Sequence, residues 1–231
     1  MLKRSFKFGA WLTGLTVLCF VVLGAVTNVP TRVTDSDVAV FRDQLHLAQP
    51  TVSLTYEQQI QLIKSVQYVV LDKAPVGKPI PDNAPREPAD LFRNKSGWCY
   101  DRSRTFDKVF SWLGFRTRHL FILYSKDPRS HSELSFWKAV MTPGTESHAV
   151  TEVLTSRGWI VVDSNSAWIS QASDGSPVDA DHISTGRLHG SQPYRTVLIV
   201  RSGPSVACTH GAASCMHPTP SLFRISIGAI S

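Results

Sequence analysis

Charged residues are scarce in this chain of 231 residues, of which 18% are charged and 42% are hydrophobic. This balance excludes an intrinsically disordered chain, because disordered segments carry many charges and bury little apolar surface. The net charge is +6, and Lys3, Arg4 and Lys7 contribute three of these charges. The remaining excess is mild and forms no dense run of Lys and Arg interleaved with aromatic residues. We therefore expect no nucleic-acid partner.

Internal repeats and low-complexity tracts are also missing, which excludes a repeat protein. No group of acidic residues resembles a calcium-binding loop, so no calcium site is predicted. The length suits one domain of typical size with accessory segments. These absences favour a single globular domain over an array or a scaffold of repeats.

Charge is missing altogether from the 24 residues between Phe8 and Thr31. A run of this length can cross the apolar core of a bilayer, about 30 Å thick, as one helix. The basic residues before it predict a cytoplasmic N-terminus at 1–7, a transmembrane signal-anchor at 8–29 and a body on the extracytoplasmic, periplasmic side. A cleaved signal peptide is the alternative, although its apolar core is normally shorter. Residues 30–52 are expected to form a stalk.

Cysteines are few, and their positions in the chain indicate different roles. The four are Cys19, Cys99, Cys208 and Cys215. Cys19 lies in the apolar run, whereas the last two lie close together in the predicted C-terminal tail, 201–231, and favour a disulfide in an exported protein. A zinc site with His210 and His217, or two free thiols, remain alternatives. Cys99 has no evident partner and calls for another explanation.

Hydrophobic periodicity predicts helices first and strands afterwards. Helices are expected at 37–47, with Asp35 or Ser36 as the cap, at 56–71, and from Cys99 to the stop at Gly114. Between them, residues 76–90 contain four prolines and indicate a long exposed loop. Strands are expected at 118–125, 148–154, 158–163 and 194–200. This order predicts an α+β fold in which N-terminal helices pack on an antiparallel sheet.

Cys99 follows Gly97-Trp98 and should lie at the N-terminus of its helix. Unpaired N–H groups and the helix dipole favour a thiolate there, and the thiolate is the nucleophilic form of cysteine. The backbone N–H of Cys99 can also contribute to an oxyanion hole. The alternative interpretation is a buried structural cysteine. Asp101 and Asp107 on the same helix are expected to face solvent.

His148 begins one predicted strand, and Asp163 ends the next one. In an antiparallel hairpin these two positions lie at the same end. His148 can then accept the proton of Cys99, and Asp163 can orient the imidazole. The alternatives are a surface histidine and a turn-forming aspartate, with Asn165 as a weaker substitute for the carboxylate. Other histidines, such as His119, are expected on the surface or in strands.

The combined order of these motifs resembles the transglutaminase-like superfamily. Its pattern is Gly-x-Cys opening a helix, His-Ala opening a strand and Gly-Trp…Asp closing the next, matched here by Gly97–Cys99, His148-Ala149 and Gly158-Trp159…Asp163. The resemblance covers about residues 55–200 and is closest to small membrane-anchored bacterial members. It implies a papain-like core at 53–200 with the catalytic residues Cys99, His148 and Asp163, and it implies no metal and no cofactor.

The resemblance implies acyl transfer at an amide or peptide bond through a Cys99 thioester, with a protein or peptide as the substrate. Hydrolysis is favoured over crosslinking to an amine, although the same triad serves both reactions. The alternative function is a non-catalytic module that is tethered to the bilayer by 8–29 and binds a peptide or an envelope polymer. A scaffold component of a membrane assembly is a third hypothesis, which rests on the anchor alone.

Overall fold

A computed structural model describes residues 11, 13–19, 29–124, 146–184, 197–201 and 225–228. The chain divides into two units, Met1–Pro30 and Thr31–Ser231. In the first unit, residues 11 and 13–19 are helical. Most of the predicted anchor at 8–29 lies outside the described residues, as do Cys208 and Cys215. Within the described residues, no helix is long and apolar enough to cross a membrane.

The second unit begins with helices and continues with strands, which confirms the predicted α+β order. Its helices are α2 (Asp35–Leu45), α3 (Tyr56–Lys73), α4 (Pro88–Asn94) and α5 (Cys99–Trp112), followed after three strands by the short α7 (Ala180–Ser184). The strands are β1 (Arg116–Tyr124), β2 (Glu146–Thr155), β3 (Gly158–Val162), β4 (Val197–Arg201) and β5 (Ile225–Gly228).

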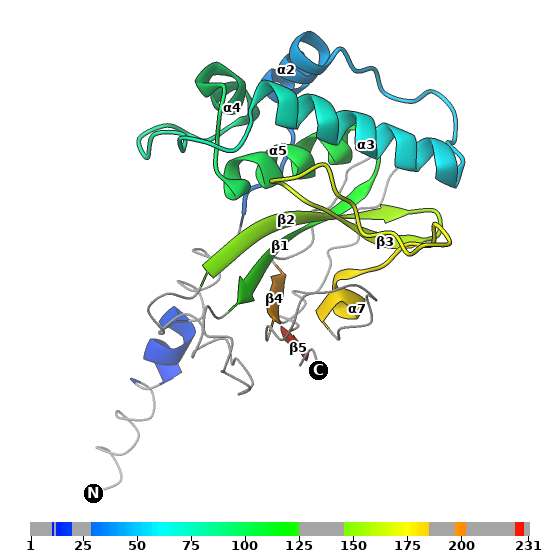
Figure 1. The fold of residues 1–231 in the computed structure, drawn as a ribbon. Helices are drawn as coiled ribbons and strands as arrows, with labels where there is room; N and C mark the ends of the chain where they lie inside the picture. Colours follow the sequence, from blue (N-terminus) through cyan, green and yellow to red (C-terminus); the bar gives the residue numbers. More distant parts are fainter. Residues whose placement is uncertain are drawn as a thin grey trace, which may run out of the picture. The chain divides into compact units, whose positions relative to one another are not determined.

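The strands form one antiparallel sheet in the order β3-β2-β1-β4-β5. Helices α2 to α5 lie on one side of this sheet, and α7 lies on the other (Figure 1). Strands β2 and β3 form a tight hairpin in which Thr155 pairs with Gly158. The φ of Gly158 is 142°, a backbone conformation that favours glycine. The hairpin brings the start of β2 and the end of β3 to the same end of the sheet.

Helix α5 is the centre of this layered arrangement. Its apolar side chains Phe106, Val109 and Phe110 are fully buried. They belong to one core cluster that includes residues of α2, α3, α4 and the sheet. A helix that packs on all sides in this way is a rigid support, and Cys99 is its first residue.

Local capping explains where the helices begin and where the predictions were slightly wrong. Helix α2 is capped by Thr34 and not by Asp35 or Ser36: the Thr34 hydroxyl accepts a hydrogen bond from the N–H of Asp37 at 3.3 Å, and the Asp37 carboxylate accepts one from the N–H of Thr34 at 2.8 Å. The loop expected at 76–90 is shorter, because Pro88 begins α4, a position that proline favours. Ile80 within this loop is buried, so the loop is not exposed throughout.

Candidate active site

Cys99 lies at the N-terminus of α5, as expected from its sequence context. Trp98 is the N-cap residue, and its backbone N–H donates to the Asp101 carboxylate at 2.9 Å. A side chain on Gly97 would place its Cβ 2.6 Å from the Leu91 Cδ1 atom and 3.2 Å from the Asp101 Cβ atom. A larger residue here would force the Leu91 side chain to shift, so glycine suits this close entry into the helix. The entry places the Cys99 thiol among the unpaired N–H groups of the first helical turn.

His148 and Asp163 come together at one end of the β2–β3 hairpin. The Nε2 atom of His148 lies 3.1 Å from Oδ2 of Asp163. Their side chains are 17% and 19% exposed, so the pair is largely buried but reaches solvent. The other ring nitrogen, Nδ1, lies 3.4 Å from the amide nitrogen of Asn165. Asp163 thus orients the ring through one nitrogen and leaves Nδ1 directed elsewhere.

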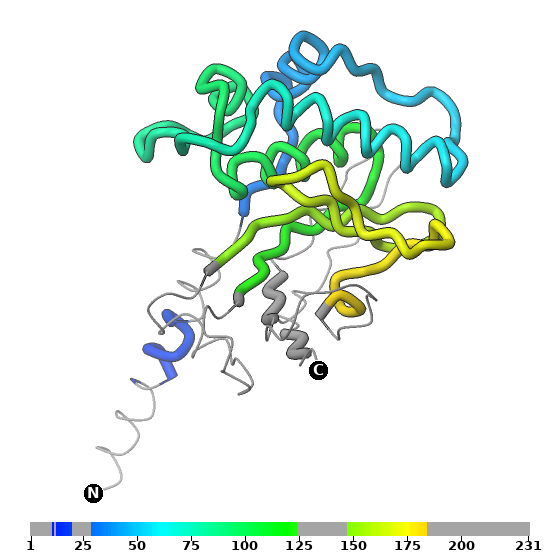
Figure 2. The backbone as a smooth tube through the Cα atoms, in the orientation of Figure 1, coloured from blue at the N-terminus to red at the C-terminus, as the bar shows by residue number. Residues whose placement is uncertain are grey.

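The loop after β3 is tied down by its own backbone and by α3. The Oδ1 atom of Asp163 accepts hydrogen bonds from the N–H groups of Asn165 and Ser166, at 2.5 and 2.8 Å. The side-chain amide of Gln67 on α3 donates to the carbonyl groups of Asp163, Ser166 and Trp168 at 2.8–3.0 Å. Figure 2 shows this loop returning toward α3 and the start of α5. The carboxylate of Asp163 is therefore held in one orientation.

The electrostatics of the three residues favour a thiolate beside an imidazolium. Burial by itself raises the pKa of the Cys99 thiol, but hydrogen bonds with the His148 side chain and with the N–H groups of Ala149 and Tyr100 outweigh it, so the pKa lies below its ordinary value of 9.0. Burial lowers the pKa of His148, whereas its hydrogen bonds with Asp163 and Cys99 dominate and raise it to about 9.

The carboxylate completes this charge pattern. Burial raises the pKa of Asp163, but the hydrogen bonds with His148 and with the N–H groups of Asn165 and Ser166 outweigh this effect and hold the pKa below its ordinary value of 3.8. A thiolate, an imidazolium and a carboxylate in this order are the parts needed to attack a carbonyl carbon and to protonate a leaving group.

Two buried side chains that support the site escaped the sequence analysis. Gln67 occupies the apolar stripe of α3, where a polar residue among Ile63, Val66 and Val70 was the available signal. Arg102 lies one turn after Cys99 and is fully buried, with hydrogen bonds to both the Cys99 and the Asp163 loops. No local pattern distinguishes Arg102 from a solvent-facing arginine, because its partners come from distant parts of the chain.

Asp101 and Asp107 do not face solvent, so that prediction was wrong. Asp101 is buried because it caps α5 and forms an ion pair with Arg86 at 3.1 Å. Asp107 pairs with His119 of β1 at 2.5 Å, and both side chains are fully buried. The Ser103 hydroxyl lies 3.3 Å from the same nitrogen of His119. A polar pair therefore lies inside the contact between α5 and the sheet.

Two other features of the molecule do not join this site. The described residues contain no group of three or more His, Cys, Asp or Glu suited to a metal ion, and the zinc candidates Cys208 to His217 lie outside them.

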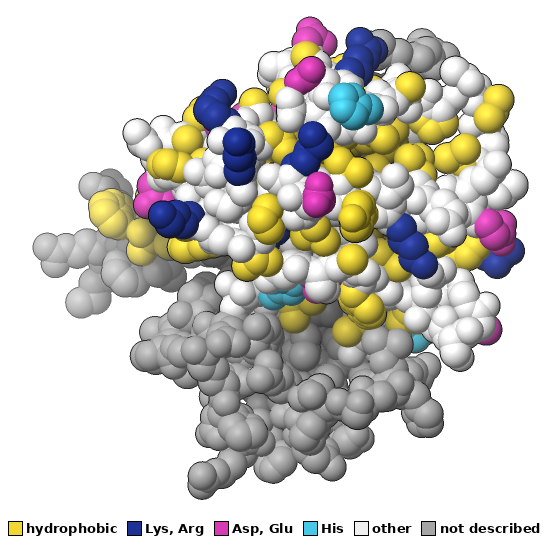
Figure 3. All heavy atoms as spheres, turned by 45° about the horizontal axis from the view of Figure 1, so that its top comes forward, with side chains coloured by type: hydrophobic (Ala, Val, Ile, Leu, Met, Phe, Trp, Pro, Cys, Tyr) yellow, Lys and Arg dark blue, Asp and Glu magenta, His cyan; other side chains and the backbone are white. Residues whose placement is uncertain are grey.

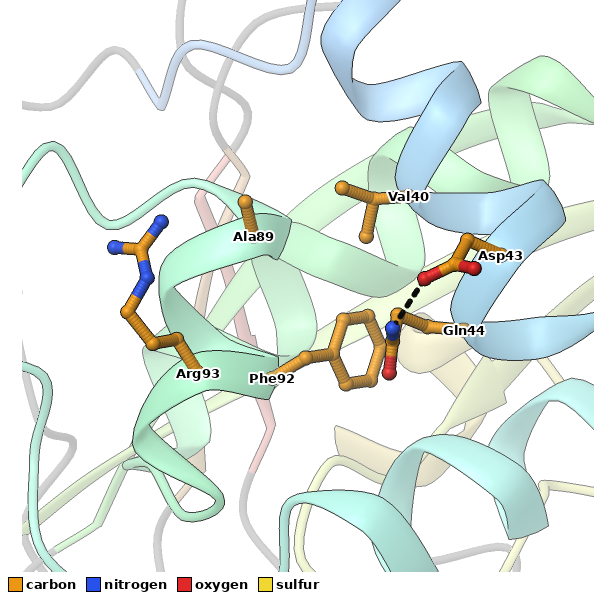
Figure 4. Close-up of a pocket in the computed structure, with 6 residues that line it drawn as sticks. All are labelled: Val40, Asp43, Gln44, Ala89, Phe92 and Arg93. Carbon is orange, nitrogen blue, oxygen red and sulfur yellow. Dashed lines mark hydrogen bonds between the residues drawn. The ribbon is translucent and has the colours of Figure 1, made fainter.

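A hollow of about 270 Å³ lies between α2 and α4 (Figure 4). Its lining residues are Val40, Asp43, Gln44, Ala89, Phe92 and Arg93. None of these is part of the Cys99, His148 and Asp163 group.

The helical face also lacks a concentrated charge. On the face shown in Figure 3, the Lys and Arg side chains of the described residues stand singly among acidic, polar and apolar ones. Apolar side chains appear between them. The charges of this face thus form no band that would steer a polyanion.

Comparison with known proteins agrees with the α+β architecture of the second unit. The profile of the transglutaminase-like superfamily matches residues 46–164, which include Cys99, His148 and Asp163. A search of curated proteins gave no match. The match extends over more than half of the chain and ends one residue after Asp163. The chain therefore belongs to the transglutaminase-like superfamily.

Proposed function

We propose that this protein is a membrane-anchored, extracytoplasmic cysteine enzyme that cleaves amide or peptide bonds through a Cys99 thioester. The observation that supports it best is the chain of contacts from the Cys99 thiol to His148 and Asp163, with a lowered thiol pKa and an imidazole pKa of about 9. Perturbed pKa values of neighbouring groups are typical of catalytic sites.

The reaction begins with attack of the Cys99 thiolate on the carbonyl carbon of the substrate. The C–O double bond opens to an oxyanion, and the backbone N–H of Cys99 at the start of α5 is a donor suited to it. The intermediate collapses, the C–N bond breaks, and the His148 imidazolium protonates the departing amine. The products of this half-reaction are the free amine and a thioester on Cys99.

The second half-reaction returns the enzyme to its starting state. Neutral His148 accepts a proton from water while the water oxygen attacks the thioester carbonyl. The C–S bond then breaks, which releases the carboxylic acid and restores the thiolate. We favour hydrolysis over transfer to an amine, and the exposed fractions of His148 and Asp163, 17% and 19%, are compatible with the entry of water.

The anchor proposal depends on the sequence of the first unit. The 24 uncharged residues from Phe8 to Thr31 follow three basic residues, a pattern typical of a signal-anchor with the body exported. Apolar side chains of the described helical residues are largely exposed, as contact with lipid requires, among them Trp11, Leu15, Val17 and Leu18. Such an anchor would hold the enzyme beside substrates at the membrane surface.

A thiol-reactive probe tests the enzyme proposal without knowledge of the substrate. The purified full chain is treated with a limiting amount of iodoacetamide, and labelling is read peptide by peptide by mass spectrometry. Cys99 should react much faster than a free cysteine at pH 6, and His148→Ala should slow it. Turnover of a peptide library should then disappear in Cys99→Ala. A slow Cys99 together with specific peptide binding would support the binding-module alternative instead.

Protease treatment of spheroplasts that express the full chain tests the anchor. The body should be digested in intact spheroplasts, and it should become protected when Lys3, Arg4 and Lys7 are all replaced by Glu, because the charge bias sets the orientation. A wild-type body that stays protected would overturn the proposed location.

A further inference from the structure

Arg102 is a buried cation beside the candidate nucleophile. It lies on α5 three residues after Cys99, and its side chain is fully buried. Burying a guanidinium is costly unless its N–H groups find acceptors and its charge finds a counter-charge. The identity of these partners indicates what the residue does.

The hydrogen bonds of Arg102 join two loops that are distant in sequence. One terminal nitrogen, Nη1, donates to the carbonyl oxygen of Gly97 at 2.6 Å and to that of Ala74 at 3.4 Å. The Nε atom donates to the carbonyl oxygen of Ser164, and Nη2 donates to the side-chain oxygen of Asn165. One planar fork therefore links the chain that leads into Cys99 with the chain that leaves Asp163.

The same contacts reach the base. Because the Asn165 oxygen accepts from Arg102, its amide nitrogen must point the other way, and it lies 3.4 Å from Nδ1 of His148. Arg102 thereby sets the orientation of the Asn165 amide. The guanidinium, the amide and the imidazole thus lie in a row, and the amide N–H can donate to Nδ1 only in the neutral ring, because the imidazolium carries a proton on that nitrogen.

All four acceptors of Arg102 are neutral oxygens, so they do not balance its charge. The anions that act on it are Cys99, Asp101 and Asp163, which raise its pKa against the larger lowering effect of burial. Asp101 already pairs with Arg86. The Cys99 thiolate and the Asp163 carboxylate are the remaining counter-charges, and a buried cation favours the anionic form of a neighbouring thiol.

We infer that Arg102 is a positioning residue that holds the nucleophile loop against the base loop and provides the fixed positive charge that favours the Cys99 thiolate. The inference rests on the proposed function, since it assigns Arg102 a part in the same site. The titratable groups around this pair are His148 from β2, which acts on the thiol, and Asp163 from the loop after β3 and Asp101 from α5 itself, which act on Arg102.

The test is the pH dependence of Cys99 alkylation in the full chain, read peptide by peptide for wild type and Arg102→Met. Removal of the charge should raise the midpoint, the pH at which the alkylation rate of Cys99 is half its maximum, by about one unit. It should also lower the alkylation rate at acidic pH about tenfold. The matched control is Arg104→Met. Arg104 is a buried arginine of the same helix, but it binds Pro85, Arg86 and Glu87. Its loss should leave the midpoint unchanged.

Arg102→Lys covers the case in which Arg102→Met does not fold. Lysine retains a cation but cannot span both loops and Asn165 at once. We expect kcat on a peptide substrate to fall at least tenfold with KM unchanged, because the side chain does not touch the substrate. A wild-type kcat in Arg102→Lys, or an unshifted midpoint in folded Arg102→Met, would overturn the inference alone. A slow wild-type Cys99 with an ordinary midpoint would overturn the proposed function as well.

Discussion

The Nε2 atom of His148 lies 3.1 Å from Oδ2 of Asp163, so the nitrogen left to act on the Cys99 thiol is Nδ1. This arrangement fixes the ring by the nitrogen remote from the nucleophile. The carboxylate favours a proton on Nε2, which in the neutral ring makes Nδ1 the basic atom.

Activity should have a broad maximum that ends on the alkaline side near pH 9. The thiolate forms above the lowered pKa of Cys99, and the imidazolium persists below about pH 9. The pair is therefore charged between these limits, which belong to the coupled pair and not to one residue. The profile of kcat/KM against pH measures both limbs. An alkaline limb near pH 6.5, the ordinary pKa of histidine, would contradict this prediction.

Protein stability should depend on pH through the same histidine. Its folded pKa is raised from 6.5 to about 9. The charged pair therefore contributes stability that is fully present below pH 6.5 and is lost as pH rises toward 9. Thermal unfolding of wild type and His148→Gln between pH 6 and pH 10 measures this, and the difference in melting temperature should shrink with rising pH. A difference that stays constant would indicate an uncharged histidine.

The three triad substitutions should impair catalysis unequally. Cys99→Ala removes the nucleophile, and His148→Ala removes the base, so each should lower kcat by several orders of magnitude, up to about 10⁶. Asp163→Ala should cost less, about 10⁴, and Asp163→Asn still less, because an amide oxygen can accept from Nε2. Double variants should lose little more than the worst single one. Circular dichroism checks the folding, and full activity in His148→Ala would mean that another residue is the base.

Gly97→Ala should destabilise the protein and displace the nucleophile. The added methyl group would lie 2.6 Å from Cδ1 of Leu91, which is fully buried. Overpacking of this kind costs about 1–3 kcal/mol in the free energy of unfolding. Leu91→Val removes the obstructing atom, so the double variant should lose less than the sum of the two single losses. Additive losses in denaturant titrations would contradict a direct clash.

Loss of Lys108 should be far more costly than loss of a surface cation. Its ammonium group lies 2.9 Å from Oδ2 of Asp37, and both side chains are 2% exposed. Lys108→Met leaves the buried Asp37 carboxylate with its hydrogen bond from the Thr34 N–H but without a counter-charge, and should cost about 3–5 kcal/mol. The control is Arg93→Met, because Arg93 pairs with Asp90 while 75% exposed, and its loss should cost less than about 1 kcal/mol. Equal losses in urea titrations would contradict the importance of the buried pair.

The sequence by itself determined the features that depend on neighbouring residues. The helix begins at Cys99 because Gly97 permits the close entry and the following residues bury one apolar face. The β2–β3 hairpin, in which His148 lies near the start of β2 and Asp163 just after the end of β3, follows from the alternation of apolar residues and the turn at Gly158. These preferences are local, so periodicity and turn chemistry predict them.

Only the tertiary structure decided which polar side chains are buried. Asp107 was expected in solvent, yet it pairs with His119 across the contact between α5 and β1. Arg102 donates hydrogen bonds to Ser164 and Asn165, which lie 62 and 63 positions further along the chain. A buried charge is stable only where folding brings such distant partners within hydrogen-bond distance. The residue pattern of one helix does not reveal these distant partners. The buried contacts that support the site therefore form only when the helices pack on the sheet.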